Sequence, residues 1–357
     1  MQRLSPYTPG KPIDELAREY GLAEDEIIKL ASNENPRGPS ARVRDAIAAA
    51  AMGVTRYPDG NGFALKNALA ARYAVASEQI VLGNGSNDIL ELATQAFLRP
   101  GDEAIYSQHA FAVYPLATQA RGGVGVSVPA HALGHDLAAM RAAITPRTRM
   151  VFVANPNNPT GTWIEPPVLR EFIASVPPGV LVVLDEAYNE YLAPEQQSDS
   201  ASWLRLHPHL LISRTFSKAY GLAGLRIGYG LSNASVAAML NRVRQPFNVN
   251  SVAQAAAIAA LADSDYVVES ARLNHAGLEQ LARGLSSMGV AHVPSHANFL
   301  LVHVGNAAGA VYESLLKQGV IVRPVANYGL PEHLRVSVGL PAENQRFLDA
   351  LKVALAR

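Results

Sequence analysis

Short apolar stretches of β-rich composition alternate with helix-like stretches over much of the chain. The strand-like stretches are QIVLGNG, EAIYSQ, GVGVSVPA, RMVFVANP, GVLVVLDEAY, HLLISRTFS and LRIGYGLS. Helix-like stretches such as SNDILELATQAFL and EPPVLREFIASV lie between several of them. This alternation predicts an α/β fold with a mostly parallel seven-stranded sheet and helices on both faces. The stretch VLVVLDEAY is apolar at both parities before Asp185, as expected of a strand that is covered on both sides.

A change of composition after NRVRQPFNVNS predicts a second, smaller α/β unit. The stretch VAQAAAIAALA indicates an Ala-rich helix, and ANFLLVHV, GAVYESLLKQGVIVRP and HLRVSVG follow it with mixed strand and helix character. We place the boundary near Ser251, so that residues 33–251 form a large domain and residues 252–357 a small one. The first 32 residues could pack on either unit, and we assign residues 1–32 to the small domain as an N-terminal arm.

The composition is that of a globular protein without a polyanionic partner. Hydrophobic residues make up 49% and charged residues 17%, and 30 basic residues balance 30 acidic ones to give a net charge of zero. We therefore expect no nucleic-acid or membrane partner. There are no cysteines, which excludes disulfides, thiolate metal sites and cysteine nucleophiles, and we expect no metal. The stretch MQRLSPYTPGKPIDELAREYG lacks the apolar core of a signal peptide, and no apolar run could span a bilayer, so we expect a cytoplasmic location.

Polar residues stand where several predicted strands end. The stretch IVLGNGSND ends a strand in a Gly-rich turn and opens a helix, and VFVANPNNPTG ends another in an Asn/Pro loop. VVLDEAY ends with Asp185 and Tyr188, and LLISRTFSK ends with Thr215, Ser217 and Lys218. Because ligands of open parallel sheets bind outside the carboxyl ends of the strands, we expect these ends to converge on one crevice.

Each of these features alone has an ordinary structural explanation. The GNGSND turn is a capped helix start, Asp185 is a helix cap, and Arg226 is an ion-pair partner. Tyr188 is a packing residue, and Asn158 is a turn residue. The Gly-rich turn is also not the dinucleotide fingerprint, because an aspartate stands where its third glycine belongs, and this disfavours a NAD-dependent dehydrogenase.

Together the features describe a site for one cofactor. Burial and a cationic neighbour can lower the pKa of Lys218 from about 10.4 toward about 7–8, which leaves an amine that forms Schiff bases with carbonyls. The Gly85–Asn87 amides, Thr215, Ser217 and Arg226 suit a phosphate, and Asp185 suits a protonated ring nitrogen. Phosphate, aldehyde and pyridinium together describe pyridoxal 5′-phosphate (PLP).

The chain resembles the fold type I, class II PLP-dependent aminotransferases along nearly its whole length, and among them the histidinol-phosphate aminotransferases. The stretches that carry this resemblance are KLASNENPRGPS, RYPDG, GNGSNDIL, NPNNPTG, LDEAY, TFSKAYGLAGLRIGY, RQPFNVNS and VANYGLPEHLRVSVG. The resemblance implies a transaminase of histidine biosynthesis that moves the amino group of L-histidinol phosphate to 2-oxoglutarate. It also implies a homodimer with shared active sites.

The resemblance assigns a role to each cofactor residue. Lys218 forms the Schiff base with PLP, Asp185 pairs with the pyridinium nitrogen, and Tyr188 and Asn158 hydrogen-bond the ring 3′-oxygen. Phe111 stacks on the ring, where the family often has tyrosine. The phosphate residues that it implies are Gly85, Ser86, Asn87, Thr215, Ser217, Arg226 and, from the neighbouring subunit, Tyr57 in RYPDG. Lys218, Asp185 and Tyr188 are the implied catalytic residues.

Substrate recognition is expected to depend on arginines of the predicted small domain. In HLRVSVG, Arg335 faces away from the apolar parity, and its guanidinium can grip either a carboxylate or a phosphate. Arg323 adds a second positive charge or is a strand-end surface residue. Tyr20, Asn33 and Asn248 are candidates for the imidazole end of the substrate. Arg37, where the family commonly has leucine, is either an exposed loop residue or a charge at the entrance of the site.

Several alternatives to this function remain open at the level of sequence. An aromatic amino-acid aminotransferase or an amino-acid-phosphate decarboxylase would use the same PLP residues with another substrate. A non-catalytic regulator on the same fold would need a DNA-binding module, and neither a helix-turn-helix pattern nor a basic patch is evident.

Overall fold

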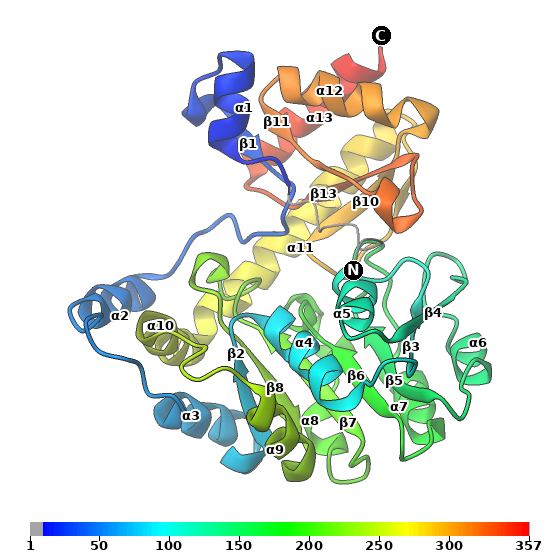
Figure 1. The fold of residues 1–357 in the computed structure, drawn as a ribbon. Coiled ribbons are helices and arrows are strands. Elements are labelled where there is room, and N and C mark those ends of the chain that lie inside the picture. The colour runs from blue at the N-terminus through cyan, green and yellow to red at the C-terminus, as the bar shows by residue number, and fades with distance from the viewer. Residues whose placement is uncertain (1–9, 357) are drawn as a thin grey trace.

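Seven strands form the central sheet of the larger part of the molecule (Figure 1), as the sequence pattern predicts. This computed structural model describes residues 10–356. In sheet order the strands are β2 (Ile80–Gly83), β8 (Gly228–Ser232), β7 (Leu210–Thr215), β6 (Leu181–Asp185), β5 (Thr148–Ala154), β3 (Glu103–Ser107) and β4 (Val124–Val128). Neighbouring strands are parallel except at β8, which is antiparallel to both β2 and β7.

The single reversed strand has a consequence for the site. Because β8 is antiparallel to both of its neighbours, β2 runs in the same direction as β7, β6 and β5. The carboxyl ends of β2, β5, β6 and β7 therefore open at one edge of the sheet. This is the arrangement in which the polar strand ends predicted from sequence meet.

Helices cover both faces of this sheet (Figure 1). One face carries α4 (Ser86–Phe97), α5 (Val113–Ala120) and α9 (Ala234–Val243). The opposite face carries α2 (Ala41–Ala51), α3 (Phe63–Tyr73), α6 (Leu137–Ala142), α7 (Pro166–Ser175), α8 (Ser200–Trp203) and α10 (Ser251–Leu261). Side chains of β5 alternate between the two cores. Val151 and Val153 pack on the face that carries α10, and Met150 and Phe152 pack on the face that carries α4.

The smaller part of the molecule is built on a four-stranded antiparallel sheet. Its strands, in sheet order, are β12 (Arg323–Pro324), β13 (His333–Ser337), β10 (Phe299–His303) and β9 (His292–Val293). The helices that pack with it are α11 (Ser264–Ser287), α12 (Ala308–Lys317) and α13 (Pro341–Leu355). Short 3₁₀ turns occur at Glu24–Glu26, Ser77–Gln79, Asn189–Tyr191, Pro194–Gln196, Ala223–Leu225, Gly305–Ala307 and Ala326–Tyr328.

The described part of the N-terminal arm packs on the small unit. Its helix α1 (Ile13–Tyr20) places Leu16 against Leu316 of α12 in one apolar cluster. Its strand β1 (Ile28–Lys29) pairs in parallel with β11 (Val320–Ile321). Residues 1–9 of the predicted arm lie outside the described residues. Backbone pairing and apolar packing therefore both attach residues 10–32 to the small unit.

The contacts of α10 and α11 bear on the domain boundary, which was expected near Ser251. The helix α10 begins there, but its buried alanines pack with α2 and α3 in the core of the large sheet. The following helix, α11, begins beside the 3₁₀ turn at 189–191 in the large unit and ends against α13 in the small one (Figure 1). We therefore propose that the two domains join within α11, with α10 belonging to the large domain.

Within residues 10–356, no helix is long and apolar enough to cross a membrane. The same residues contain no group of three or more His, Cys, Asp or Glu side chains arranged to hold a metal ion.

Candidate active site

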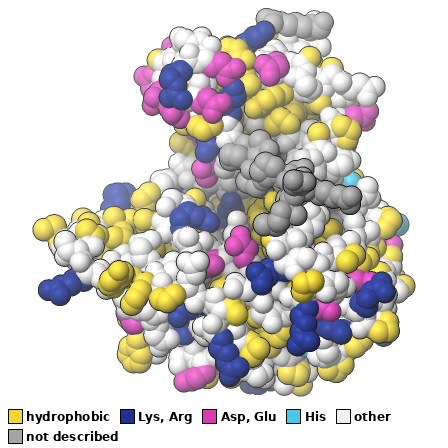
Figure 2. Space-filling model, in the orientation of Figure 1, with side chains coloured by type: hydrophobic (Ala, Val, Ile, Leu, Met, Phe, Trp, Pro, Cys, Tyr) yellow, Lys and Arg dark blue, Asp and Glu magenta, His cyan; other side chains and the backbone are white. Residues whose placement is uncertain are grey.

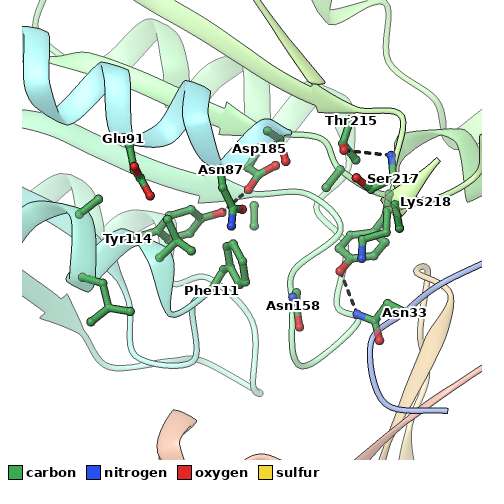
Figure 3. Close-up of a pocket in the computed structure, with 18 of the residues that line it drawn as sticks. Asn33, Asn87, Glu91, Phe111, Tyr114, Asn158, Asp185, Thr215, Ser217 and Lys218 are labelled. Atoms are coloured by element: carbon green, nitrogen blue, oxygen red, sulfur yellow. Dashed lines mark hydrogen bonds between the residues drawn. The ribbon is translucent and has the colours of Figure 1, made fainter. Parts of the chain in front are cut away.

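A cavity of about 880 Å³ lies at the carboxyl edge of the large sheet, with walls from both domains. Figure 3 shows its polar side chains pointing toward a common space from the ends of several strands. The predicted site residues that line it are Asn33, Ser86, Asn87, Phe111, Asn158, Asp185, Tyr188, Thr215, Ser217, Lys218, Arg226 and Arg335. The convergence expected of four strand ends is thus present in the fold.

Asp185 lies at the floor of the cavity, at the last position of β6. Its side chain is buried, and burial raises the pKa of this carboxyl to about 6. One oxygen, Oδ2, accepts a hydrogen bond from the hydroxyl of Tyr114 at 2.8 Å. The other, Oδ1, is buried with no hydrogen-bond partner among the described residues. A buried carboxylate oxygen without a donor is costly, so this atom fits a ligand that brings its own N–H.

Lys218 faces the same space from the loop after β7. Its ammonium donates a hydrogen bond to the Ser32 carbonyl at 3.1 Å and lies 5.9 Å from the ring centroid of Tyr188. Burial, followed by the positive charges of Arg335 and Arg226, lowers the pKa of Lys218 to about 8. A useful fraction of neutral amine is therefore present near neutral pH, as a nucleophile toward an aldehyde requires.

The turn between β2 and α4 forms the anion end of the cavity. Gly85 has φ 83°, and a Cβ there would lie 2.4 Å from Nη2 of Arg226, so only glycine leaves room for the guanidinium. A Cβ on Gly228 would lie 2.4 Å from the Ser86 nitrogen, which lets β8 run close beneath the start of α4. Helix N-terminal amides, a guanidinium and the hydroxyls of Thr215 and Ser217 make a donor set that suits a phosphate.

On the side toward the small domain, hydrogen bonds join four predicted residues in two pairs. Arg335, buried on β13, donates to Oδ1 of Asn158, and a second guanidinium nitrogen donates to the Ala31 carbonyl at 2.8 Å. Asn33 donates from Nδ2 to the hydroxyl of Tyr188 at 2.9 Å. The opposite face of β13 packs in the small-domain core through Leu334 and Val336, as its parity predicts.

Phe111 stands beside the cavity just before α5 and meets the ring of Tyr114 edge-on, with centroids 5.9 Å apart. Its apolar face is available to a flat ring that enters the space above Asp185 (Figure 3).

Five predicted residues do not line the cavity of the same chain: Gly85, Tyr57, Arg323, Tyr20 and Asn248. Gly85 is adjacent to it and shapes the seat of Arg226. Tyr57 is 83% exposed and stacks on Phe247. Arg323 is buried on β12 directly across from Arg335.

Two of the imidazole candidates are engaged elsewhere. The hydroxyl of Tyr20 donates to Glu313 at 2.9 Å near the surface of the small domain. The amide of Asn248 donates to the Leu82 carbonyl and to the carboxylate of Asp88, at 3.0 and 2.7 Å. Each side chain therefore has a structural role away from this cavity, and sequence alone did not show those partners.

Arg37 does not line the cavity either. Its Nη1 donates to the Tyr266 carbonyl at 2.9 Å and to Oγ of Ser270 at 3.2 Å, and its guanidinium lies over the Tyr266 ring. Asn35 donates to Ser270 and to the Ala219 carbonyl. The arginine is an exposed turn residue, which is the first of the two expected alternatives, and it attaches the segment after the arm to the start of α11.

Tyr114, Ser32 and Glu34 are among the cavity residues that sequence analysis missed. Tyr114 follows Phe111 by three positions in an apolar helix, where an aromatic residue ordinarily indicates core packing. Ser32 acts through its carbonyl, which no side-chain pattern reveals. Glu34 stands within the quoted NENP stretch, pairs with Lys29 at 3.0 Å and lines the rim.

The fold and the site define a class of enzyme. The sequence profile of the family described as "Aminotransferase class I and II" matches residues 25–351, so the chain belongs to the class I and II aminotransferases. It is 60% identical over 356 residues to histidinol-phosphate aminotransferase 2 of Pseudomonas aeruginosa, covering 100% of this chain and 96% of that protein. It is 58% identical over 355 residues to histidinol-phosphate aminotransferase 2 of Nitrosospira multiformis, covering 99% and 91%.

A solved structure agrees with these sequence relatives. The histidinol-phosphate aminotransferase of Sinorhizobium meliloti, crystallised in complex with pyridoxal 5′-phosphate, superposes with a TM-score of 0.91 at 31% identity. The match covers 100% of this chain and 98% of that one. The fold predicted from sequence is therefore confirmed, and so is the resemblance to this branch of the family.

Proposed function

We propose that the protein is a PLP-dependent transaminase that moves the amino group of L-histidinol phosphate to 2-oxoglutarate, giving imidazole-acetol phosphate and glutamate in histidine biosynthesis. The observation that carries the proposal is one cavity that presents an amine of lowered pKa, a carboxylate oxygen without a donor and a guanidinium-lined anion seat. The names and high identity of the relatives support the choice of substrate. A cytoplasmic location is part of the proposal, and cell fractionation would check it.

The residues present fit PLP at each of its polar groups. The Gly85–Asn87 turn, Thr215, Ser217 and Arg226 would hold the phosphate, Oδ1 of Asp185 would face the ring nitrogen, and Tyr188 and Asn158 would reach the ring oxygen. Phe111 would cover one ring face. When bound, PLP supplies an aldehyde that takes up the substrate nitrogen and a ring that accepts the electron pair released at the substrate Cα.

The protein's own groups control the protons of this reaction. Lys218 is the only lysine among the described cavity residues. Its neutral amine would take the proton from the substrate Cα and later return a proton to the carbon that belonged to the cofactor aldehyde. Asp185, held ionised, would keep a proton on the ring nitrogen. Asp185 and Tyr188 are buried, and their low exposure to water strengthens electrostatic interactions at this end of the cavity.

Arg335 is suited to a transaminase because such an enzyme accepts two substrates in turn. Its planar guanidinium offers paired donors that match either the carboxylate of glutamate or the phosphate of histidinol phosphate. A hydrogen bond to the backbone carbonyl of Ala31 and one to the side-chain oxygen of Asn158, in the loop after β5, hold the guanidinium in place before a substrate arrives. One buried arginine can thus serve both halves of the exchange.

The test of the proposed function is a comparison of amino donors with 2-oxoglutarate as acceptor. We expect kcat/KM for L-histidinol phosphate to exceed that for phenylalanine and tyrosine by at least about 100-fold, since these amino acids carry a carboxylate but lack the phosphate and the imidazole, and a site built to hydrogen-bond a group rejects ligands without it. Production of glutamate would be measured alongside loss of the donor. Equal or higher kcat/KM for the aromatic amino acids would assign the enzyme to them, and release of CO₂ from an amino-acid phosphate would assign it to the decarboxylases.

The Arg335→Lys variant tests in the same assay whether one arginine binds the anions of both substrates. Lysine keeps the charge but loses the paired donors, so kcat/KM should fall about 10- to 100-fold for both histidinol phosphate and glutamate. A loss confined to one of the two substrates would show that different groups bind their anions.

We further propose that the enzyme is a homodimer with shared active sites. Large apolar side chains are exposed after α2 and at the start of α3: Met52 is 87% exposed, and Val54, Tyr57 and Phe63 accompany it. Figure 2 shows hydrophobic side chains gathered over this protruding region. A patch of this kind is typical of a protein interface, and a second copy of the chain would bring its Tyr57 toward the phosphate seat.

Mixed dimers would test the sharing. Tyr57→Ala should weaken PLP binding about tenfold by removing one hydrogen bond to a charged group, and Lys218→Ala should be inactive. If Tyr57 acts across the interface, a dimer of one chain of each variant contains one fully intact site. Refolding the two variants together in equal amounts should then give about a quarter of wild-type activity at limiting PLP, because about half of the dimers are mixed and each has one of two sites. Activity no greater than the mean of the separate variants would contradict sharing.

A further inference from the structure

Tyr114 is the polar side chain in contact with Asp185 that sequence analysis did not find. It lies on α5, is fully buried, and donates its hydroxyl proton to Oδ2 of Asp185 at 2.8 Å. Figure 3 shows its ring reaching from α5 toward the carboxylate at the end of β6. The contact joins two elements that are far apart in sequence.

The ring of Tyr114 is held rigidly. It stacks on Phe152 of β5 with centroids 4.6 Å apart and an angle of 7° between the planes, and it meets Phe111 edge-on. The hydroxyl therefore has little freedom to leave Asp185. Burial keeps the pKa of the Tyr114 phenol well above its ordinary value, so the phenol remains protonated and can donate at neutral pH.

The two oxygens of Asp185 are consequently unlike each other. The hydrogen bond from Tyr114 occupies Oδ2, while Oδ1 is buried and has no partner among the described residues. A carboxylate fixed at one oxygen by a rigid donor presents the other in one direction only. Asp185 lines the cavity in which the ring nitrogen of the cofactor would stand.

We propose that Tyr114 is a positioning residue that holds Asp185 ionised and aims its free oxygen at the cofactor ring nitrogen. The inference rests on the proposed PLP-dependent function and adds to it a residue outside the cofactor set. Tyr114 acts through Asp185 and through Phe111, so it links the group that would contact the ring nitrogen with the group that would cover the ring face.

The charges around Asp185 support an effect on its ionisation. Burial raises the pKa of the carboxyl most strongly, and the hydrogen bond from Tyr114 is the largest influence that opposes it. The other groups that act on it are the backbone N–H of Ala187 and the ammonium of Lys218, which lower the pKa, and Glu186, which raises it, while Tyr188 lies close by. Removing the Tyr114 hydroxyl would remove the main interaction that lowers the pKa of Asp185, so burial would raise this pKa further toward neutrality.

The test is PLP binding by the cofactor-free protein in wild type and in Tyr114→Phe, at pH 8 and at pH 6. Losing one hydrogen bond to a carboxylate raises its pKa by about one unit. The ratio of the variant's Kd to the wild-type Kd should then be about fivefold larger at pH 6 than at pH 8, because only the ionised carboxylate pairs with a ring N–H. Using the ratio cancels the titrations of the cofactor and of Lys218.

A second arm separates positioning from packing. In an Asp185→Asn background, which carries no charge to protect, Tyr114→Phe should change Kd by less than about twofold and without pH dependence. Tyr106→Phe, which removes a hydroxyl from the same apolar cluster outside the cavity, should match wild type at both pH values. Thermal melts of each variant would establish that all are folded.

The outcomes are distinct. A Kd ratio that is equal at pH 6 and pH 8, or an undiminished effect of Tyr114→Phe in the Asp185→Asn background, would overturn the role of Tyr114 alone. Failure of the folded wild-type protein to bind PLP at all would overturn the proposed function and this inference with it.

Discussion

Replacing Lys218 with alanine is expected to lower kcat about 10⁴-fold or more while the protein still folds and binds PLP. The lysine would provide both the nucleophile that holds the cofactor and the base that moves the Cα proton, and no other lysine among the described residues lines the cavity. Single-turnover assays with histidinol phosphate would measure the loss. An absorbance band in the violet that borohydride abolishes should be present in wild type and absent from the variant.

The matched control for this change is Lys66→Ala. Lys66 is a second lysine whose pKa burial lowers, but it lies on α3, donates to Asn61 and does not face the cavity. Its variant should keep near wild-type kcat. Robust turnover by Lys218→Ala without an added amine would end the assignment of Lys218.

The lowered pKa of Lys218 adds a pH dependence to the same experiment. Below pH about 8 the amine is mostly protonated and cannot attack an aldehyde; above it the neutral form dominates. The rate at which the cofactor-free protein takes up PLP covalently should therefore rise through a midpoint near pH 8. An ordinary exposed lysine would place that midpoint near pH 10.4.

Asp185→Asn is expected to have two opposite effects: a loss of turnover of about 10²- to 10³-fold and a gain in stability of the cofactor-free protein. Turnover falls because asparagine cannot keep a proton on the ring nitrogen electrostatically. Stability rises because burial raises the pKa of this carboxyl from 3.8 to about 6, so the folded protein disfavours the charged form. Ionisation thus costs stability as the pH rises through this range, and above pH 6 the cost is fully present.

Urea denaturation of cofactor-free protein would measure the stability effect. At pH 8 the variant should be more stable by about 1–3 kcal/mol, the equivalent of about one to two pKa units. At pH 4 the advantage should largely disappear, because the native carboxyl is then protonated. Near-normal turnover would contradict the contact between Asp185 and the ring nitrogen. An equal stability difference at both pH values would show that ionising the buried carboxyl does not cost stability.

Site residues could be predicted from the sequence where a residue type of known chemistry directly follows a predicted strand. Asp185 and Lys218 each follow an apolar run, so their placement at the edge of a parallel sheet follows from local pattern alone. The reversed strand β8 did not disturb this result, since reversal at two successive pairings restores the direction of β2.

What the sequence could not provide is the choice of partners across the fold. Tyr20 and Asn248 are polar residues of the right kind, yet their hydrogen bonds go to Glu313 and to Asp88. The contact between Tyr114 and Asp185 spans 71 positions and depends on how α5 packs on the sheet. The alanine-rich helix α10 has little contrast between its faces, so its sequence carried no sign that it packs on the large domain.

The helix α11 gives the molecule a mechanical property. At about 1.5 Å per residue its 24 residues form a rod about 36 Å long, anchored by Arg37 and Asn35 at one end and by the small-domain core at the other. A tilt of about 5° at the anchored end displaces the far end by about 3 Å, roughly the length of a hydrogen bond. Lys218 follows β7 of the large sheet and Arg335 lies on β13 of the small sheet, so a change in the angle of this helix would alter the distance between the amine and the guanidinium.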